Sequence, residues 1–141
     1  MIRQYGTADL DQVLEVWLAA SKIAHPFLTE EFMATERENI RNVHMPKAAT
    51  WVYEDAERVV GFIALIGNEV GAVFVSPEMQ GRGIGRALMD LARDRREILE
   101  LDVFQANRIG RRFYEKYGFI QIGRHVHEGS GQPCLRLRYG G

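Results

Sequence analysis

Residues 73–86 read Val-Phe-Val-Ser-Pro-Glu-Met-Gln-Gly-Arg-Gly-Ile-Gly-Arg, and they join a strand-like apolar run to the start of a helical pattern. Gly81, Gly83 and Gly85 permit backbone angles that other residues avoid, so successive N–H groups can converge on one anion. A helix that begins here adds the positive end of its dipole. The stretch therefore predicts a strand–loop–helix unit whose loop cradles a phosphate.

Helical and strand patterns extend from this stretch in both directions. After a short apolar start at residues 2–5, we expect Thr7 to cap one helix and Thr29 to begin a second helix that runs toward residue 43. The other expected elements are strands at 50–55, 58–66 and 70–75, a helix from the glycine run to residue 96, a strand at 98–103, a helix at 107–117, and closing strands at 119–127 and 134–139. The order β-α-α-β-β-β-α-β-α-β-β predicts an α/β fold, with a mixed α+β sheet covered by helices and a βαβ crossover at 70–103.

The composition limits the class of protein. With 141 residues, 46% of them hydrophobic, residues 1–141 are expected to form a single domain. The 18 basic and 19 acidic side chains nearly cancel, so we expect neither nucleic acid nor a membrane as a partner. A single cysteine, Cys134, excludes an internal disulfide, and no segment approaches the roughly 20 apolar residues of a membrane span. These features predict a cytoplasmic protein.

Known nucleotide motifs compete for the glycine loop, and their spacing separates them. A P-loop requires a lysine after its last glycine, and no lysine follows any glycine here. The dinucleotide pattern Gly-x-Gly-x-x-Gly would begin at Gly81 and require a glycine at the position of Arg86. A plain strand-to-helix turn without a ligand stays open on this loop alone.

Two motifs resemble the GNAT N-acetyltransferase superfamily. Gln80, Gly83 and Gly85 match the pattern Gln/Arg-x-x-Gly-x-Gly/Ala, which is similar to the acyl-coenzyme A signature of that superfamily. Residues 107–119 resemble its segment Asn-x-x-Ala-x-x-Phe-Tyr-x-x-x-Gly-Phe, with Gly110 in place of the alanine. The His-Pro-Phe-Leu stretch at 25–28 and the Tyr-Gly-Gly ending are most like its small bacterial YjaB-like members.

The resemblance implies an acyl-coenzyme A N-acyltransferase fold and a set of cofactor contacts. The expected cofactor-binding residues are Phe74, Val75, Gln80, Gly81, Arg82, Gly83, Ile84, Gly85, Arg86, Asn107 and Tyr114. A simple helix N-cap explains Asn107 nearly as well, and solvated side chains explain Arg82 and Arg86 equally well. In the family, the strand around Val75 splays from its neighbour and offers its N–H to the thioester carbonyl, and the tyrosine matched by Tyr114 protonates the departing thiolate. A phenol stays protonated at neutral pH, which suits Tyr114 to the role of general acid, although a core aromatic is the plainer interpretation.

Three residues are candidates for the acceptor side of the site. Glu69 is the acid nearest in sequence to the expected cleft and is our candidate general base, although a solvated turn residue is the plainer interpretation. His25 and Phe27 fall where the family shapes its acceptor pocket, and a neutral imidazole can accept a proton near pH 7. His125 and His127 lack further ligands nearby, so we expect no metal site.

The sequence thus predicts an acetyl-coenzyme A-dependent N-acetyltransferase in which a primary amine attacks directly in a ternary complex. The acceptor can be a small molecule, a peptide or a protein lysine. A non-catalytic acyl-coenzyme A-binding regulatory module is the alternative. The C-terminal sheet edge can pair with a second copy, so a homodimer is also considered.

Overall fold

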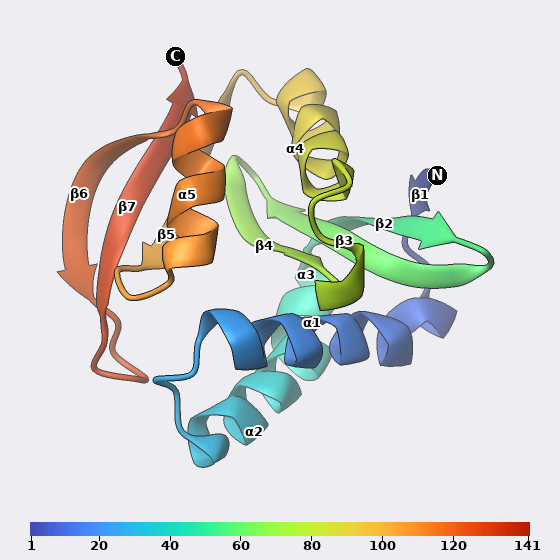
Figure 1. Cartoon of the computed structure of the whole chain (residues 1–141), viewed down its shortest axis with the longest axis horizontal. Coiled ribbons are helices and arrows are strands. Elements are labelled where there is room, and N and C mark those ends of the chain that lie inside the picture. The colour runs from blue at the N-terminus through green and yellow to red at the C-terminus, as the bar shows by residue number, and fades with distance from the viewer.

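The computed structural model describes residues 1–141 (Figure 1). Its strands are β1 (Ile2–Gln4), β2 (Ala49–Asp55), β3 (Arg58–Ile66), β4 (Glu69–Val75), β5 (Ile98–Phe104), β6 (Ile120–Val126) and β7 (Pro133–Gly140). Its helices are α1 (Leu10–Ala24), α2 (Glu30–Asn39), α3 (Met45–Lys47), α4 (Ile84–Arg95) and α5 (Arg108–Tyr117), with a π-helical turn at Ile40–His44 and 3₁₀ turns at Thr7–Asp9 and Pro77–Met79. The expected fold class is confirmed, and so is the element order apart from the additional short helix α3.

All seven strands form one sheet in the order β1-β2-β3-β4-β5-β7-β6. Every neighbouring pair is antiparallel except β4 and β5, which α4 connects as the expected βαβ crossover. Figure 1 shows α1 and α2 below the half of the sheet that contains β3, and α4 and α5 on the opposite side.

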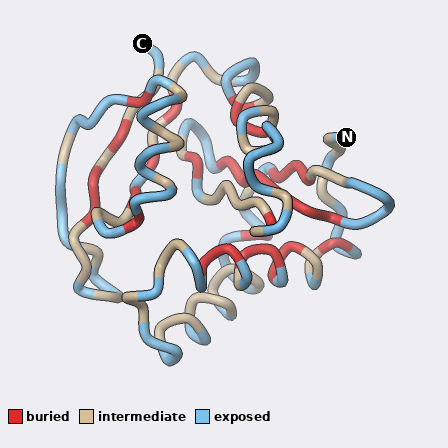
Figure 2. The backbone as a smooth tube through the Cα atoms, viewed as in Figure 1, coloured by how far each residue is buried: buried red, intermediate tan, exposed pale blue.

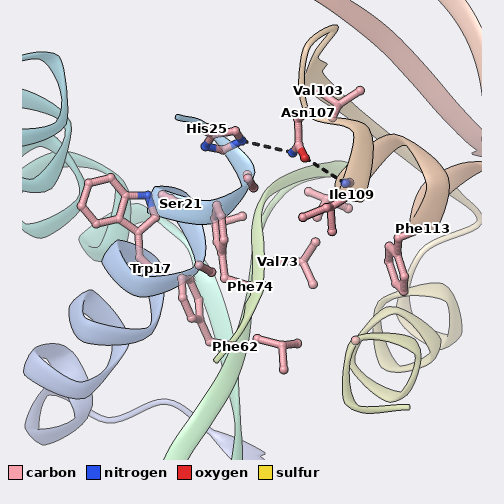
Figure 3. A pocket seen from close by; sticks show the side chains of 18 of the residues that line it. Trp17, Ser21, His25, Phe62, Val73, Phe74, Val103, Asn107, Ile109 and Phe113 are labelled. Atoms are coloured by element: carbon pink, nitrogen blue, oxygen red, sulfur yellow. Dashed lines mark hydrogen bonds between the residues drawn. The ribbon is translucent and has the colours of Figure 1, made fainter. Parts of the chain in front are cut away.

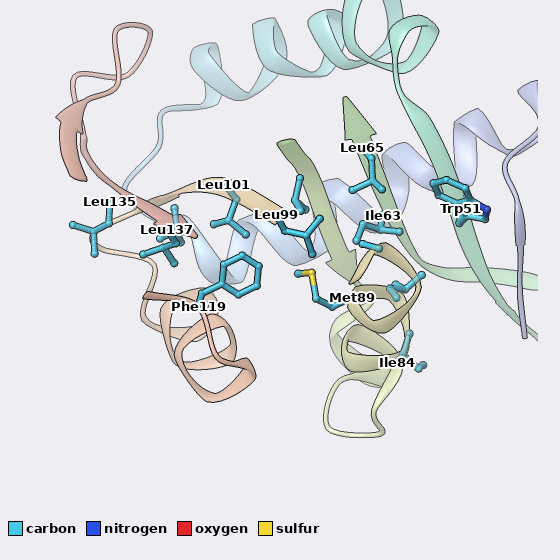
Figure 4. Close-up of a cluster of buried hydrophobic side chains, with 14 of the residues drawn as sticks. Trp51, Ile63, Leu65, Ile84, Met89, Leu99, Leu101, Phe119, Leu135 and Leu137 are labelled. Atoms are coloured by element: carbon cyan, nitrogen blue, oxygen red, sulfur yellow. The ribbon is translucent and has the colours of Figure 1, made fainter. Parts of the chain in front are cut away.

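Helices on both sides give the sheet two hydrophobic cores. The larger core joins α4 to apolar residues of β3 and β5, such as Ile63 and Leu101 (Figure 4). The smaller core lies between α1 and the other face, where Trp17 packs with Phe62. Strand β3 is buried on both faces, which explains its nearly continuous apolar sequence.

The outer strand β6 is exposed along most of its length (Figure 2). It leaves Ile120, Ile122 and Val126 in contact with solvent. An unpaired edge of this kind can pair with a second copy. Homodimerisation therefore stays a prediction.

The sheet opens between β4 and β5. The two strands share only the register pair Glu69–Glu100, next to a hydrogen bond of 2.9 Å from the Glu100 N–H to the Asn68 carbonyl. The pairing of β3 with β4 slips between Ala64 and Leu65, and this slip leaves Gly71 without a partner as a β-bulge. Beyond the bulge, β4 follows β3 and leaves β5.

The peptide groups of Val73 and Val75 face this opening. Ser76 N–H donates to the Val60 carbonyl at 2.8 Å, which places Ser76 in a hydrogen-bonded pair with β3. Because such pairs alternate along an antiparallel ladder, Val73 and Val75 direct their N–H and C=O groups away from β3. The strand splay implied by the family resemblance is present here.

Two local predictions need correction. Thr7 does not cap α1, because residues 7–9 form a 3₁₀ turn and the Asp9 carboxylate accepts the Gly6 N–H at 2.8 Å. The second helix does not end near residue 43, because a π-helical turn carries the chain into α3. Pro46 lies in α3, directly after this turn. The predicted start of the second helix at Thr29 is confirmed, because the Thr29 hydroxyl oxygen caps α2 by accepting the Phe32 N–H at 3.0 Å.

No helix in the structure combines the length and the apolar character needed to cross a membrane.

Candidate active site

The glycine loop has the form of an anion cradle. Gly81 and Gly83 have φ angles of +80° and +83°, and a Cβ at either position would meet no atom within 4 Å. The Gln80 N–H donates to the Pro77 carbonyl, and the Ala87 N–H donates to the Gly83 carbonyl. The backbone N–H groups of residues 81–86, which lie between them, donate to no backbone carbonyl. Unpaired N–H groups at the start of a twelve-residue helix fit a pyrophosphate.

Neighbouring side chains fix this loop in place. Gln80 Nε2 donates to the Val75 carbonyl at 3.1 Å and ties the loop to the end of β4. A Cβ at Gly85 would lie 3.3 Å from the Phe113 ring and 3.8 Å from Val75, so the glycine allows α4, α5 and β4 to approach one another closely. Ile84 is buried, so its backbone is the part available to a ligand.

The two arginines of the loop differ in their access to the site. Both are exposed and neither takes part in a salt bridge. Arg86 lines the central cleft, whereas Arg82 lies outside it. Arg86 is therefore the better placed cation for a phosphate.

A cleft of about 870 Å³ runs from this cradle through the opening between β4 and β5 to the side of α1 and α2. Its walls include Val73 and Val75 of β4, Tyr114 of α5, and Phe32 of α2. Figure 3 shows Val73 and Phe74 on one side of this space and Asn107 and Ile109 on the other. One continuous cavity therefore joins the predicted cofactor loop to the predicted acceptor side.

Tyr114 stands on this cleft with its hydroxyl in apolar surroundings. Its ring packs edge-on against Phe113 and Phe119, at centroid distances of 5.5 and 5.6 Å. Burial alone raises the pKa of Tyr114 well above its ordinary value. The phenol therefore keeps its proton across the physiological range.

Asn107 caps α5, as the sequence predicts, and also reaches across the cleft. Its Oδ1 accepts the Gly110 N–H at 2.9 Å, and its Nδ2 lies 3.1 Å from Nε2 of His25 (Figure 3). Burial lowers the pKa of His25 to about 4, so the imidazole is neutral at physiological pH. Because Asn107 donates to its one lone pair, His25 is poorly suited to act as a base.

The predicted acceptor residues are brought together, with different exposure to the cleft. His25 lines the cleft, whereas Phe27 packs against His25 and Phe104 at 5.7 and 5.4 Å and does not line it. Phe74 also lies on this side, 6.4 Å from the His25 ring. Its side chain thus faces the acceptor region rather than the glycine loop.

Glu69 lines the cleft but is engaged in an ion pair. Both of its carboxylate oxygens accept hydrogen bonds from Arg136, at 2.6 and 2.7 Å. The same guanidinium contacts Glu100 at 3.0 Å and Asp102 at 3.2 Å. Glu69 can therefore receive a proton only through water or after this pair opens.

Arg136 also joins the strands at the point where they separate. It lies on β7 and binds carboxylates on β4 and β5, beside the Glu69–Glu100 pair. We expect Arg136→Met to lower the free energy of unfolding by about 1–2 kcal/mol, because three carboxylates would then repel one another. Urea unfolding at low and high salt measures this loss, which added salt should reduce.

The matched control for this prediction is Arg58→Met. The Arg58–Glu78 pair is mostly exposed, so its removal should cost under about 0.5 kcal/mol. The assigned role of Arg136 and its three carboxylates would be contradicted if Arg136→Met lost no more stability than Arg58→Met. It would also be contradicted if added salt did not reduce the loss of stability in Arg136→Met.

Sequence reasoning did not select several residues that line the acceptor side. His127 packs against Phe104 at 5.3 Å and against Phe32 at 5.7 Å, and Asp102 lines the cleft nearby. Asp102 and Phe104 alternate with the buried Leu101 and Val103 along β5, so strand periodicity could have placed them on this face. No comparable signal marks Phe32 or His127.

Comparison with known proteins agrees with this geometry. The family model for the acetyltransferase (GNAT) domain matches residues 46–121. The peptidyl-lysine N-acetyltransferase YiaC of Escherichia coli K12 is 33% identical over 84% of this chain and 82% of its own length. The peptidyl-lysine N-acetyltransferase YjaB of the same strain is 31% identical over 99% of this chain and 97% of its own length.

Solved structures show the same fold. The solution structure of apo-form YjaB from Escherichia coli matches with a TM-score of 0.88 at 30% identity, over 100% of this chain and 98% of the other. The PaiA N-acetyltransferase of Thermoplasma acidophilum, in complex with coenzyme A, has a TM-score of 0.76 at 20% identity, over 99% and 98% of the two chains. The family model and the YiaC and YjaB relatives show that this chain belongs to the GNAT acetyltransferase family, as a YjaB-like acyltransferase.

Proposed function

We propose that this enzyme transfers the acetyl group of acetyl-coenzyme A to the side-chain amine of a lysine in a peptide or protein. The observation that carries the proposal is the continuous cleft, which joins an anion cradle at the start of α4 to an acceptor side through the opening between β4 and β5. The peptidyl-lysine activity named for YiaC and YjaB supports lysine over a small amine as the acceptor.

The residues of the chain supply the functions that this reaction needs. The N–H groups of residues 81–86 and the Arg86 side chain would hold the cofactor phosphates. The N–H groups of Val73 and Val75 face the opening, and they would receive the thioester carbonyl and stabilise the oxyanion that forms on attack. Asn107 keeps one amide hydrogen free to donate to the cofactor arm.

Proton transfers complete the proposed mechanism. The amine nitrogen forms a bond to the acetyl carbon, the carbon–sulfur bond breaks, and Tyr114 gives its proton to the leaving sulfur. The nitrogen loses one proton as the amide forms, and this proton returns through water to the Tyr114 phenolate. The ammonium of lysine must first lose a proton, and Glu69 is our candidate to accept it through water. Glu36, Glu69 and Asp102 line the cleft and attract a cationic acceptor.

Matched peptides test the acceptor. We expect thiol release from acetyl-coenzyme A, with acetylated peptide seen by mass spectrometry, for a peptide that has one lysine and a blocked N-terminus. The same peptide with arginine for lysine and a free N-terminus should react at least about tenfold more slowly, because the only reactive amine is then the α-amine. A preference for the second peptide would overturn the lysine assignment.

The alternative of a non-catalytic binding module makes a separate prediction. Such a module would bind acetyl-coenzyme A and release no thiol with any amine offered.

The cytoplasmic location and the homodimer stay predictions.

A further inference from the structure

A hydrogen bond between His25 and Asn107, here called the polar joint, connects the acceptor side of the cleft to helix α5. Because Oδ1 of Asn107 accepts the Gly110 N–H, the orientation of the carboxamide is defined, and its nitrogen faces His25. The imidazole therefore accepts at Nε2 and carries its hydrogen on Nδ1. The two residues lie 82 positions apart in the chain, so the bond ties two distant segments together.

Gly110 makes room for this joint. A Cβ at position 110 would lie 2.5 Å from Nδ2 and 3.0 Å from Cγ of Asn107, which is too close for a real side chain. An alanine would therefore push the carboxamide out of its present position. The glycine that departs from the family motif thus permits the hydrogen bond between Asn107 and His25.

Aromatic rings surround the joint. The His25 ring lies 5.0 Å from Phe104, 5.7 Å from Phe27 and 6.4 Å from Phe74, and Asn107 is only 8% exposed. A hydrogen bond in such surroundings has few competing partners and holds its geometry well.

We propose that the His25–Asn107 bond sets the distance between the α1–α2 connection and α5, and that His25 is thereby a positioning residue for the amine acceptor. Asn107 and Tyr114 are seven residues apart, which places them near the same side of α5. The bond therefore aligns the wall that receives the acceptor with the helix that carries the proposed general acid. The inference rests on the proposed acetyl transfer and deepens it.

The decisive variant is His25→Leu, which keeps an apolar side chain against the rings but removes the hydrogen-bond acceptor. We expect the KM for the lysine peptide to rise by about tenfold, while kcat and the Kd of acetyl-coenzyme A change by less than about twofold. His25→Gln can accept the same bond through Oε1 and should recover most of the lost affinity. Arg124→Leu, at an exposed site on β6 that does not line the cleft, is the control and should resemble the parent enzyme.

Gly110→Ala tests the same joint from the other side. It should raise the KM for the peptide as His25→Leu does, and the double variant should be no worse than the more affected single variant. In ¹⁵N spectra of the imidazole, Nε2 of His25 should be unprotonated and hydrogen-bonded in the parent and should lose that bond in Gly110→Ala. Gly123→Ala, where a Cβ would meet Arg136 at an ordinary 3.5 Å, is the control.

The outcomes separate this inference from the proposed function. If the parent enzyme is active, either of two results would overturn the positioning role of His25. One is an unchanged peptide KM in His25→Leu, and the other is additive effects on KM in the double variant of His25→Leu and Gly110→Ala. A parent enzyme without transfer activity would instead overturn the proposed function. The imidazole spectrum tests the hydrogen bond itself in either case.

Discussion

Tyr114→Phe should lower kcat by about a hundredfold to a thousandfold, because it removes the proton donor for the leaving thiolate. The change deletes one hydroxyl and leaves the ring contacts with Phe113 and Phe119 in place. We therefore expect the KM for the peptide and the Kd of acetyl-coenzyme A to change by less than about twofold. Single-turnover measurements isolate the chemical step from product release.

Tyr139→Phe is the matched control for this loss. Tyr139 packs against Phe119 at 5.5 Å, as Tyr114 does at 5.6 Å, but it does not line the cleft. Its hydroxyl should therefore be dispensable for turnover. If Tyr114→Phe and Tyr139→Phe both turn over like the parent, Tyr114 is not the general acid.

The elevated pKa of Tyr114 also predicts the pH profile. Because burial favours the neutral phenol, ionisation of Tyr114 should cause no fall in rate below about pH 10. A buried phenol is also a weak acid, so its proton should transfer as the carbon–sulfur bond breaks.

Gly83→Val should weaken the binding of acetyl-coenzyme A by about a hundredfold, which corresponds to the loss of one or two hydrogen bonds to a charged group. Gly83 has a φ of +83° and is the N-cap residue of α4. A β-branched residue strongly disfavours that angle, so the loop must reorganise and its N–H groups no longer converge. Isothermal titration calorimetry measures the change.

Gly67→Val reproduces the backbone strain outside the glycine loop. Gly67 lies in the turn between β3 and β4 with a φ of +60°, and a Cβ added there would meet no atom within 4 Å, as at Gly83. Both variants should be less stable than the parent, but only Gly83→Val should lose affinity for acetyl-coenzyme A. Equal affinity in the two variants would argue against the cradle.

Periodicity in the sequence predicted most of the fold. The β-branched and aromatic runs at 50–55 and 58–66, the strand pattern at 98–103 and the helical spacing after Gly83 identified elements that the structure confirms. Helix boundaries were harder to predict near residue 43, because the π-helical turn depends on tertiary packing and leaves no clear pattern in the sequence.

The details of the site depend on contacts between distant segments. The family resemblance implied that β4 splays, but only the structure shows the bulge at Gly71 and the cluster around Arg136 at the base of the opening. The sequence placed Glu69 near the cleft without showing that Arg136 occupies both of its oxygens. It likewise identified Asn107 as a cap but gave no sign of its bond to His25.

The most direct test of the central claim is a single-turnover reaction of the purified enzyme with acetyl-coenzyme A and a blocked peptide that contains one lysine. Mass spectrometry would locate the acetyl group, and NADH in place of acetyl-coenzyme A would serve as a cofactor control. We predict one acetyl group on the lysine side chain, formed only with acetyl-coenzyme A and enzyme together and lost in Gly83→Val at low acetyl-coenzyme A concentration. Saturable binding of acetyl-coenzyme A without transfer to any amine would contradict the catalytic account and favour the binding module.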